Sequence, residues 1–425
     1  MPQVEPTAAP KGPVNLTVAW WGPPGQTYAY ELCLQDYKDK NPNVSFEIVS
    51  PGDAGGYTTK IMTMVGAGAP PDVLLMENSS LTGGRFLPFA AAGVVADLTD
   101  ACDKANIKES DFVPGSWANS SLNGKLYGIP YVSNIQAICY NADLFEAAGQ
   151  PTPRELYDQG KWDYEHFVAA AQALTNPDKK IYGVTPWRWS MQGFVQMYGG
   201  CELSPDGKKI TLTDPKTIKG YEALYDLTTK YKVAPTTSEA EAAGNMWGIF
   251  AAQQSAMMIQ GNWDLLGAEN NMKFNYDYVP HPAGPAGRFV WAFTGQWGMS
   301  ADSKNKESAF DLLQALTSVE GMKLATIMKV GRTCARQEVV DKYYYDTWRG
   351  KNVKAFVDSF PCGRNAPFLD GILQTFINAE LDLVMEGKQT VAEALAKAEP
   401  KCQAELDKGE IIVQVDKIMC GEGCK

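Results

Sequence analysis

The alternation of strand-type and helix-type segments in the first third of the chain is the feature that most constrains its fold. Apolar β-type runs at 16–20, 44–50 and 71–77 are separated by helical patterns at 28–42 and 57–70. Strands and helices that alternate in this way form a mostly parallel, doubly wound α/β sheet. Because such sheets bind ligands beyond the carboxyl ends of their strands, the residues after each run are the first candidates for a functional site.

The rest of the chain repeats this alternation and ends in helices. A second α/β set begins near 135–149. The later patterns are a helix at 162–176, a strand at 181–187, an Asp-Gly hairpin at 203–212, strands at 255–263 and 289–300, an amphipathic stretch at 306–329, and helices from about Phe368. At 425 residues the chain is long for one core, so we expect two domains of comparable size.

The charge balance excludes several classes of partner. Lys and Arg number 38 against 49 Asp and Glu, a formal net charge of -11, and no basic block interrupts this acidic background. Nucleic acids and anionic membranes both bind to positively charged protein surfaces, so neither is expected as a partner. No apolar run approaches the roughly 20 residues of a membrane-spanning helix, and we expect a soluble monomer.

The N-terminal segment, residues 1–13, is rich in Pro and Ala and contains neither an apolar run nor a cleavage site. We expect it to be a disordered tether ahead of the first strand. Such a tether indicates that an export signal, with or without a lipid-bearing cysteine, has been removed. The alternative is a frayed N-terminus of a cytosolic protein.

Cysteine usage points to an oxidising compartment. The nine cysteines are Cys33, Cys102, Cys139, Cys201, Cys334, Cys362, Cys402, Cys420 and Cys424. No close pair is matched by a second pair at zinc-ligand spacing, so disulfides outside the cytoplasm explain them better. Because nine is odd, at least one thiol stays free, and we expect it to be Cys139 in its apolar strand. The expected disulfides join Cys334 to Cys362 and Cys402 to Cys420 or Cys424.

Motifs of the common enzyme classes are absent from the sequence. His166 and His281 are the only histidines, neither lies in a metal-binding pattern, and we expect both in core or surface positions. There is no Gly-x-Ser-x-Gly elbow, phosphate-binding loop or dinucleotide fingerprint, so neither a cofactor nor a metal is expected. A hydrolase with two catalytic carboxylates stays open, because the separation of Asp and Glu side chains cannot be read from sequence.

Tryptophans follow the predicted strands. Those at or just past a strand end are Trp20, Trp21, Trp187, Trp189, Trp263, Trp291 and Trp297. Each alone is explained as well by core packing, but their shared position favours a ligand. Because consecutive strand residues face opposite sides, we expect one indole of the Trp20–Trp21 pair in the core and the other facing a ligand.

A flat indole complements the C–H face of a sugar ring. Removing about 60 Å² of apolar surface per stacked ring contributes ~1.5 kcal/mol, whereas micromolar affinity needs about 8 kcal/mol. Carboxylates and amides must therefore add hydrogen bonds to the sugar hydroxyls. Such groups near the tryptophans are Glu77, Asn78, Asn134, Gln136, Asn262, Asp264 and Gln296. Helix capping is the alternative role for Asn78, Ser79 and Asp264.

Four segments together resemble family 1 extracellular solute-binding proteins, the sugar-capturing components of ABC importers related to maltose-binding protein. The segments are "PPDVLLME", "GKLYGIPYVSNIQAICYNADLFEAAG", "FAAQQSAMMIQGNW" and "GKQTVAEALAKA". The resemblance covers roughly residues 14–407. Its most specific element is Phe-x(5)-Ala-Met-x(3)-Gly-x-Trp, from Phe250 to Trp263, followed by Tyr140-Asn141. Cys139 stands where the family usually has an aliphatic residue.

The resemblance implies a two-lobed periplasmic-binding-protein fold of type II, with discontinuous α/β lobes joined by hinge strands and closing on a ligand by hinge bending. The implied ranges are 14–131 and 290–334 for the N-terminal lobe, 137–278 and 338–425 for the C-terminal lobe, and crossovers near 131–137, 278–290 and 332–338.

The resemblance also implies particular ligand contacts. The family's aromatic contact after the Ala-Met strand corresponds to Trp263, and its polar contacts correspond to Glu77, Asn78 and Asn134. The maltose binder has a carboxylate where this chain has Asn134, which argues against maltose itself. Arg364 precedes the C-terminal helices, where the family often adds a contact. The full expected set is Trp20, Trp21, Glu77, Asn78, Asn134, Trp187, Trp189, Trp263, Asp264, Gln296, Trp297 and Arg364.

The expected function is therefore the capture of a neutral di- or oligosaccharide in the periplasm or on the outer face of the cell membrane. The protein would then deliver the sugar to the permease subunits of an ABC importer, with no bond made or broken. Three alternatives stay open. They are a sensor subunit that feeds a receptor, a binder of polyols or glycerol phosphodiesters, and a carbohydrate-active hydrolase.

Overall fold

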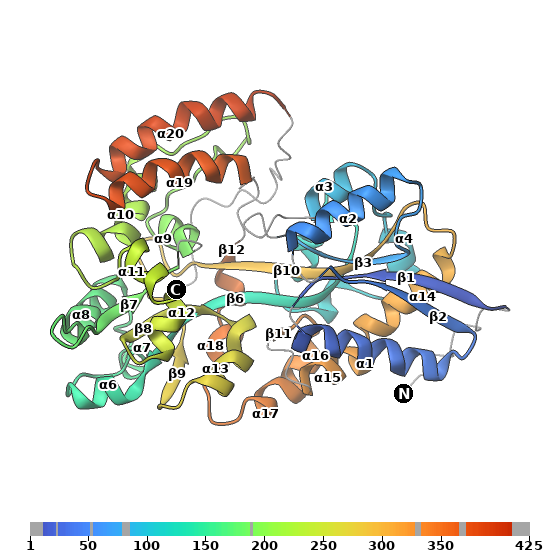
Figure 1. The fold of residues 1–425 in the computed structure, drawn as a ribbon, viewed down its shortest axis with the longest axis horizontal. Coiled ribbons are helices and arrows are strands. Elements are labelled where there is room, and N and C mark those ends of the chain that lie inside the picture. The colour runs from blue at the N-terminus through green and yellow to red at the C-terminus, as the bar shows by residue number, and fades with distance from the viewer. Residues whose placement is uncertain are drawn as a thin grey trace. The chain divides into compact units, whose positions relative to one another are not determined.

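The computed structural model describes residues 12–22, 24–51, 54–78, 86–187, 190–327, 333–364 and 371–409. The chain divides into two compact units, coloured by residue number in Figure 1. Unit 1 comprises Met1–Ser133 and Phe293–Thr347, and unit 2 comprises Asn134–Ala292 and Trp348–Lys425. The predicted tether at 1–13 lies almost wholly outside the described residues. The predicted hinge crossovers stay a prediction.

Unit 1 contains the sheet that the alternating pattern predicts. β1 (Val14–Ala19) lies between β2 (Val44–Val49) and β3 (Val73–Glu77), and both pairings are parallel. The connections contain α1 (Pro24–Lys40) and α2 (Ala54–Gly66). Since these strands run in one direction, the residues that follow β1 and β3 reach the same edge of the sheet.

Two long strands, β6 (Ile129–Asn141) and β10 (Val290–Met299), each contribute residues to both units. In unit 1, β10 pairs antiparallel with β3, and β11 (Thr333–Cys334) pairs antiparallel with β6. The sheet strands of unit 1 are therefore mixed in direction, and in this unit the prediction of a mostly parallel sheet holds for β1, β2 and β3. Sequence periodicity identifies a strand but not the direction in which it runs.

The other elements of unit 1 are short, apart from two helices near its end. They are α3 (Phe86–Ala91), α4 (Thr99–Lys104), a 3-10 helix (Glu109–Asp111), α5 (Ser116–Asn119), β4 (Ser121–Leu122), β5 (Lys125–Leu126), α14 (Lys306–Thr317), α15 (Val319–Ile327), α16 (Gln337–Val339), a π-helical turn (Val340–Tyr344) and α17 (Tyr345–Thr347). The predicted amphipathic stretch at 306–329 is thus divided into two helices, with Ser318 in an extended conformation between them.

The sheet strands of unit 2 assemble on the second half of β6. β8 (Ser255–Gly261) lies between β6, with which it is antiparallel, and β7 (Tyr182–Thr185), with which it is parallel. β9 (Tyr276–Val279) also pairs with β6. The parallel arrangement of β7 and β8 matters for the site, because both strands end at the same edge of the sheet.

Helices cover this sheet and complete unit 2, and α19 and α20 lie side by side (Figure 1). The remaining elements are α6 (Ala142–Ala147), α7 (Pro153–Asp158), α8 (Tyr164–Leu174), α9 (Met191–Met197), α10 (Pro215–Thr229), α11 (Thr237–Ala242), α12 (Met246–Ala251), a 3-10 helix (Asn262–Asp264), α13 (Leu265–Asn271), α18 (Lys354–Val357), a 3-10 helix (Phe360–Cys362), β12 (Gly363–Arg364), α19 (Gly371–Met385) and α20 (Val391–Leu406). The predicted hairpin at 203–212 is reduced to one turn and an isolated bridge between Leu203 and Ile210.

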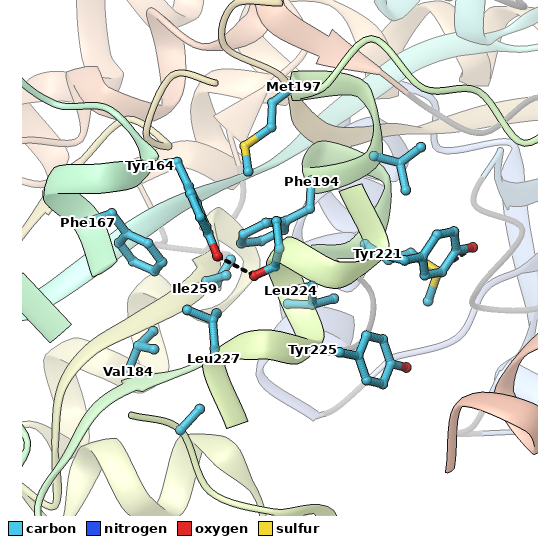
Figure 2. Close-up of a cluster of buried hydrophobic side chains, with 14 of the residues drawn as sticks. Tyr164, Phe167, Val184, Phe194, Met197, Tyr221, Leu224, Tyr225, Leu227 and Ile259 are labelled. Carbon is cyan, nitrogen blue, oxygen red and sulfur yellow. Dashed lines mark hydrogen bonds between the residues drawn. The ribbon is translucent and has the colours of Figure 1, made fainter. Parts of the chain in front are cut away.

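An apolar cluster holds the helices of unit 2 against β7 and β8. Figure 2 shows Tyr164 of α8, Phe194 of α9 and Leu224 of α10 close together in this cluster. The Tyr164 hydroxyl is satisfied inside it, donating to the Ala223 carbonyl at 2.6 Å. Each large apolar side chain buried here contributes roughly 1.5–3 kcal/mol. The cluster includes Val184 of β7, so it anchors the strand ends that lead into the site.

The cysteines correct one part of the sequence prediction. Cys33, Cys102, Cys139, Cys334 and Cys402 are buried free thiols, whereas Cys201 and Cys362 are disulfide-bonded. The free state of Cys139 is confirmed, but the expected Cys334–Cys362 pair and the expected disulfide of Cys402 are wrong. Cys334 lies inside unit 1 with its Sγ 3.0 Å from Sδ of Met322, because closeness in sequence does not determine which side chains face each other. Cys420 and Cys424 lie outside the described residues.

Among the helices that the structure describes, none combines the length and the apolar character that crossing a membrane requires.

Candidate functional site

The ends of β7 and β8 and two short helices surround a hollow in unit 2, which we call the first hollow. Its volume is about 430 Å³, within the usual range for small-molecule sites. The lining residues are Trp187, Asn245, Trp247, Trp263, Asp264, Gly267 and Asn271. Three of them, Trp187, Trp263 and Asp264, belong to the set expected from the sequence. The first hollow therefore brings together side chains from distant parts of the chain.

Sheet geometry explains why Trp187 and Trp263 meet. Trp187 is the second residue after β7, and Trp263 is the second residue after β8. The two strands are parallel, with Thr185 opposite Met258, so the segments that follow them emerge at the same edge. Both indoles are partly exposed, which leaves part of each ring surface accessible from the first hollow.

Gly261 fixes the position of the Trp263 ring. The indole lies directly over the Gly261 backbone, so that a Cβ there would be only 2.2 Å from Cη2 and Cζ3 of the ring. The ring also contacts the edge of Trp291, with centroids 5.8 Å apart and planes at 75°. The preceding residue, Asn262, is buried and accepts a hydrogen bond from the Ile135 N–H at 3.2 Å. Trp263 is thus held in place before any ligand binds.

Two residues that the sequence analysis missed complete the first hollow. Trp247 lies in the first turn of α12, and its Cζ2 is the nearest atom to the position of a Cβ on Gly267, 3.9 Å away. Asn245 caps the same helix, because its Oδ1 accepts a hydrogen bond from the Gly248 N–H at 2.8 Å. A sequence signal existed, since the Asn-x-Trp at 245–247 places an amide near an indole just as Asn262-Trp263 does. It was missed because it precedes a helix and does not end a strand.

The polar groups of the first hollow suit an uncharged polyhydroxyl ligand. Asp264 contributes a carboxylate, and its side chain makes no capping hydrogen bond to α13, so the alternative capping role is not the one observed. Asn245 and Asn271 contribute amides, which donate and accept. In the described part of the chain, neither lysine nor arginine lines this hollow. Three indoles and three planar polar groups form a site that can stack on sugar rings and bind their hydroxyls.

Other expected site residues of unit 2 lie outside the first hollow. Asn134 is fully buried in β6, and its amide has no hydrogen-bond partner in the described part of the chain. Gln136, two residues further along the same strand, is also buried, and its amide also has no hydrogen-bond partner among the described residues. Arg364 lies with its guanidinium 5.4 Å from the Phe289 ring centroid and donates to the Gly363 carbonyl at 2.8 Å. Burial lowers the pKa of Arg364. Trp189 falls outside the described residues.

Two of the three aromatic candidates of unit 1 are core residues. Trp20 and Trp297 are both 0% exposed, and each packs edge-on against Tyr30, with centroids 5.8 and 5.3 Å away. Trp21 is 7% exposed and lies against the Tyr57 ring at 4.8 Å. The core indole of the Trp20–Trp21 pair is therefore Trp20, and Trp21 is only slightly more accessible.

The polar candidates of unit 1 are buried near the end of β3. Glu77 is its last residue, and Asn78 follows it. Oδ1 of Asn78 accepts the Thr294 N–H at 2.8 Å and so ties β3 to β10. Gln296 of β10 is 0% exposed, and its amide lacks a hydrogen-bond partner within the described ranges. A buried amide with unused hydrogen bonds requires an explanation, and a bound ligand is one.

The histidines lie in the kinds of position that were expected. His281 is buried, and burial lowers its pKa to about 3, so it is neutral at physiological pH. His166 lies in the first turn of α8, with its Nδ1 2.7 Å from Oδ1 of the capping Asp163. Across the described residues, no group of His, Cys, Asp and Glu side chains is arranged to hold a metal ion.

Comparison with known proteins identifies solute-binding relatives. The family described as bacterial extracellular solute-binding protein matches residues 21–323. A binding protein of Brucella abortus is 26% identical over 380 residues, 86% of each chain. The multiple sugar-binding protein of Streptococcus mutans is 20% identical over 307 residues, 68% of each chain. An ABC substrate-binding protein of Listeria monocytogenes, solved with cycloalternan, superposes with a TM-score of 0.79 and 24% identity over 93% of this chain and 99% of that one. This likeness confirms the expected two-lobed α/β fold.

Proposed function

The chain belongs to the family of bacterial extracellular solute-binding proteins, and from this premise we propose that it binds a neutral di- or oligosaccharide at the first hollow. The observation that carries the proposal is the convergence of Trp187, Trp247 and Trp263, from three separate elements, on one hollow that also contains amides and a carboxylate. Aromatic plates with planar polar neighbours are what a sugar ring requires.

The energetics are consistent with such a ligand. Three stacking contacts at ~1.5 kcal/mol each contribute about 4–5 kcal/mol. This is short of the roughly 8 kcal/mol of a micromolar complex, and hydrogen bonds from Asp264, Asn245 and Asn271 are proposed to supply the difference.

The net charge of the lining residues supports a neutral ligand over a phosphodiester. Asp264 is the only charged residue among the described residues that line the first hollow, and it is acidic. An anionic ligand would place like charges close together. Among the ligand classes open from the sequence, neutral sugars are therefore favoured over glycerol phosphodiesters.

The rest of the proposed function follows the family. We propose that the protein works outside the cytoplasm, attached to the cell surface by a lipid, and that the loaded monomer delivers its sugar to the permease of an ABC importer. We propose no chemical step, so incubation with the bound sugar should yield no product. Chromatography of the sugar after long incubation tests this point, and a shortened sugar would support the hydrolase alternative.

Replacing Trp247 tests the site with a residue that the sequence analysis did not select. A thermal-shift screen against a glycan panel first identifies the tightest neutral sugar, and calorimetry then measures its Kd. Trp247→Ala should weaken binding about tenfold, because one stacking contact of ~1.5 kcal/mol is lost. The matched control is Trp117→Ala, since Trp117 is a partly exposed indole of unit 1 that lies against Phe112 and should not change the Kd. Equal Kd values for Trp247→Ala and the wild type would remove the first hollow from the ligand site.

A further inference from the structure

A second hollow of about 670 Å³ lies next to the first in unit 2, and the two share Trp187 and Asn245. The residues that line it are Pro186, Trp187, Thr236, Thr237, Ser238, Ala240, Glu241, Gly244, Asn245, Met246, Asn378, Asp382, Met385 and Glu386. Because two of its residues also line the first hollow, the two hollows are adjoining parts of one surface. The question is whether the second hollow belongs to the ligand site.

We propose that the ligand site continues past Trp187 into the second hollow, so that the natural ligand is an uncharged or amine-bearing chain of at least three sugar rings. This inference rests on the proposed function, because it extends the first hollow. It goes beyond it by assigning a minimum length and an allowed charge to the ligand.

The shared residues give the two hollows a common wall. Trp187 is a flat apolar plate at the end of β7, so consecutive rings of one chain can contact it from the two hollows. Asn245 is immobilised, since its Oδ1 caps α12 through the Gly248 N–H. Its NH₂ group can donate to the glycosidic oxygen that joins two rings, or to a hydroxyl beside it. A donor and a flat plate that both hollows share favour a ligand that spans the two.

The far wall of the second hollow is one face of α19. Asn378, Asp382 and Met385 are spaced four and three residues apart, so they lie on the same side of the helix. Oδ1 of Asn378 is buried and has no hydrogen-bond partner among the residues that the structure describes. A sugar hydroxyl is the kind of donor that would satisfy this oxygen. The apolar side chain of Met385 offers surface for the C–H face of a ring.

The near wall is α11, whose polar residues have two different roles. The hydroxyl of Thr236 is engaged in the helix cap, where it donates to the Glu239 carboxylate at 2.7 Å. Thr237 and Ser238, in the first turn, and Glu241, in the next, also line the hollow. The second hollow thus combines carboxylates with amides, as the first does, and adds hydroxyls.

The charge of the second hollow restricts the ligand further. Its lining includes the carboxylates of Glu241, Asp382 and Glu386, and none of the described residues that line it is a lysine or an arginine. Lys388, which does not line it, forms an ion pair with Glu386. Uronic acids and phosphorylated sugars would meet like charges there, whereas neutral and amine-bearing sugars would not.

A ladder of gluco-oligosaccharides from mono- to hexasaccharide, in α-1,4, α-1,6 and β-1,4 linkage, tests the inference by calorimetry. We expect at least a tenfold gain in affinity between the disaccharide and the tetrasaccharide of the best-bound series. A chain of the same length that ends in a uronic acid should bind at least threefold more weakly than the neutral one. An affinity that stops rising at the disaccharide would overturn the inference.

Filling the second hollow separates it from the first. Ser238 is exposed and lines only the second hollow, so Ser238→Trp should abolish the gain for longer chains and leave the disaccharide Kd within twofold. Ser238→Ala is the control and should retain the gain. If Ser238→Trp keeps the full gain, the second hollow is not part of the site. If no member of the ladder binds and Trp247→Ala changes nothing on the glycan panel, the proposed function itself fails, and the inference fails with it.

Discussion

Replacing Gly261 with alanine moves the Trp263 ring without deleting it. The new methyl carbon would lie 2.2 Å from Cη2 and Cζ3 of the indole and 2.3 Å from Cε3, where carbon atoms need about 3.5–4.0 Å. The φ angle of Gly261 is -92°, which alanine adopts readily. The backbone therefore tolerates the change, and the ring must move by more than about 1 Å.

The size of the effect follows from the stacking contact. A displaced ring loses the ~1.5 kcal/mol of a sugar stacked over about 60 Å², which is roughly a tenfold increase in Kd. The crowding itself costs about 1–3 kcal/mol of stability. Gly267→Ala is the matched control in the same hollow. Its methyl would lie 3.9 Å from Trp247 Cζ2, an ordinary contact, and α13 would gain up to about 1 kcal/mol.

Calorimetric titration with the best neutral sugar, together with thermal unfolding of both variants, measures the two effects separately. We expect a Kd about tenfold higher for Gly261→Ala and a Kd within twofold of the wild type for Gly267→Ala. The reasoning is refuted if Gly261→Ala binds as tightly as the wild type, because the position of the Trp263 ring would then not contribute to affinity.

Three further variants test other parts of the structure. Glu202 accepts a hydrogen bond from Tyr221, and burial raises the pKa of this carboxyl to about 7. Between about pH 4.5 and 7 the folded state therefore binds more protons than the unfolded state, and the free energy of unfolding falls by about 3 kcal/mol as the pH rises. Glu202→Gln should remove that dependence in urea unfolding at about pH 5 and about pH 8; an unchanged slope would show that another group causes it. Asn245→Asp keeps the cap of α12 but loses the NH₂ donor, so sugar affinity should fall about threefold to tenfold at an unchanged melting temperature, and unaltered affinity would contradict the donor role. Trp20→Ala removes a fully buried indole and should cost about 3–5 kcal/mol in denaturant unfolding; a loss below about 1 kcal/mol would contradict its place in the core.

Much of the fold could be predicted because its signals are local. The runs at β1, β2 and β3 are apolar and separated by helical patterns, and the structure forms those elements and pairs these strands in parallel. Strand direction is a long-range property, so the antiparallel pairing of β10 with β3 could not be read from the sequence. The cysteine pairs failed for a similar reason, since Cys334 and Cys402 are buried thiols whose neighbours are set by packing.

The candidate site was predictable only where it follows strands. Trp187 and Trp263 end neighbouring parallel strands, so one topological rule was enough to place them together. Trp247 reaches the same hollow from the start of a helix, and no rule of strand ends selects it. The same rule also selected Trp20 and Trp297, which are buried, because a residue at a strand end can turn into the core as easily as out of it.

A crystal structure of the complex with the best-bound neutral oligosaccharide tests the central claim most directly. We predict sugar rings within about 4 Å of the Trp247 and Trp263 rings, with hydroxyls hydrogen-bonded to Asp264 or Asn245. A sugar bound away from both tryptophans, with the first hollow left to solvent, would contradict the account.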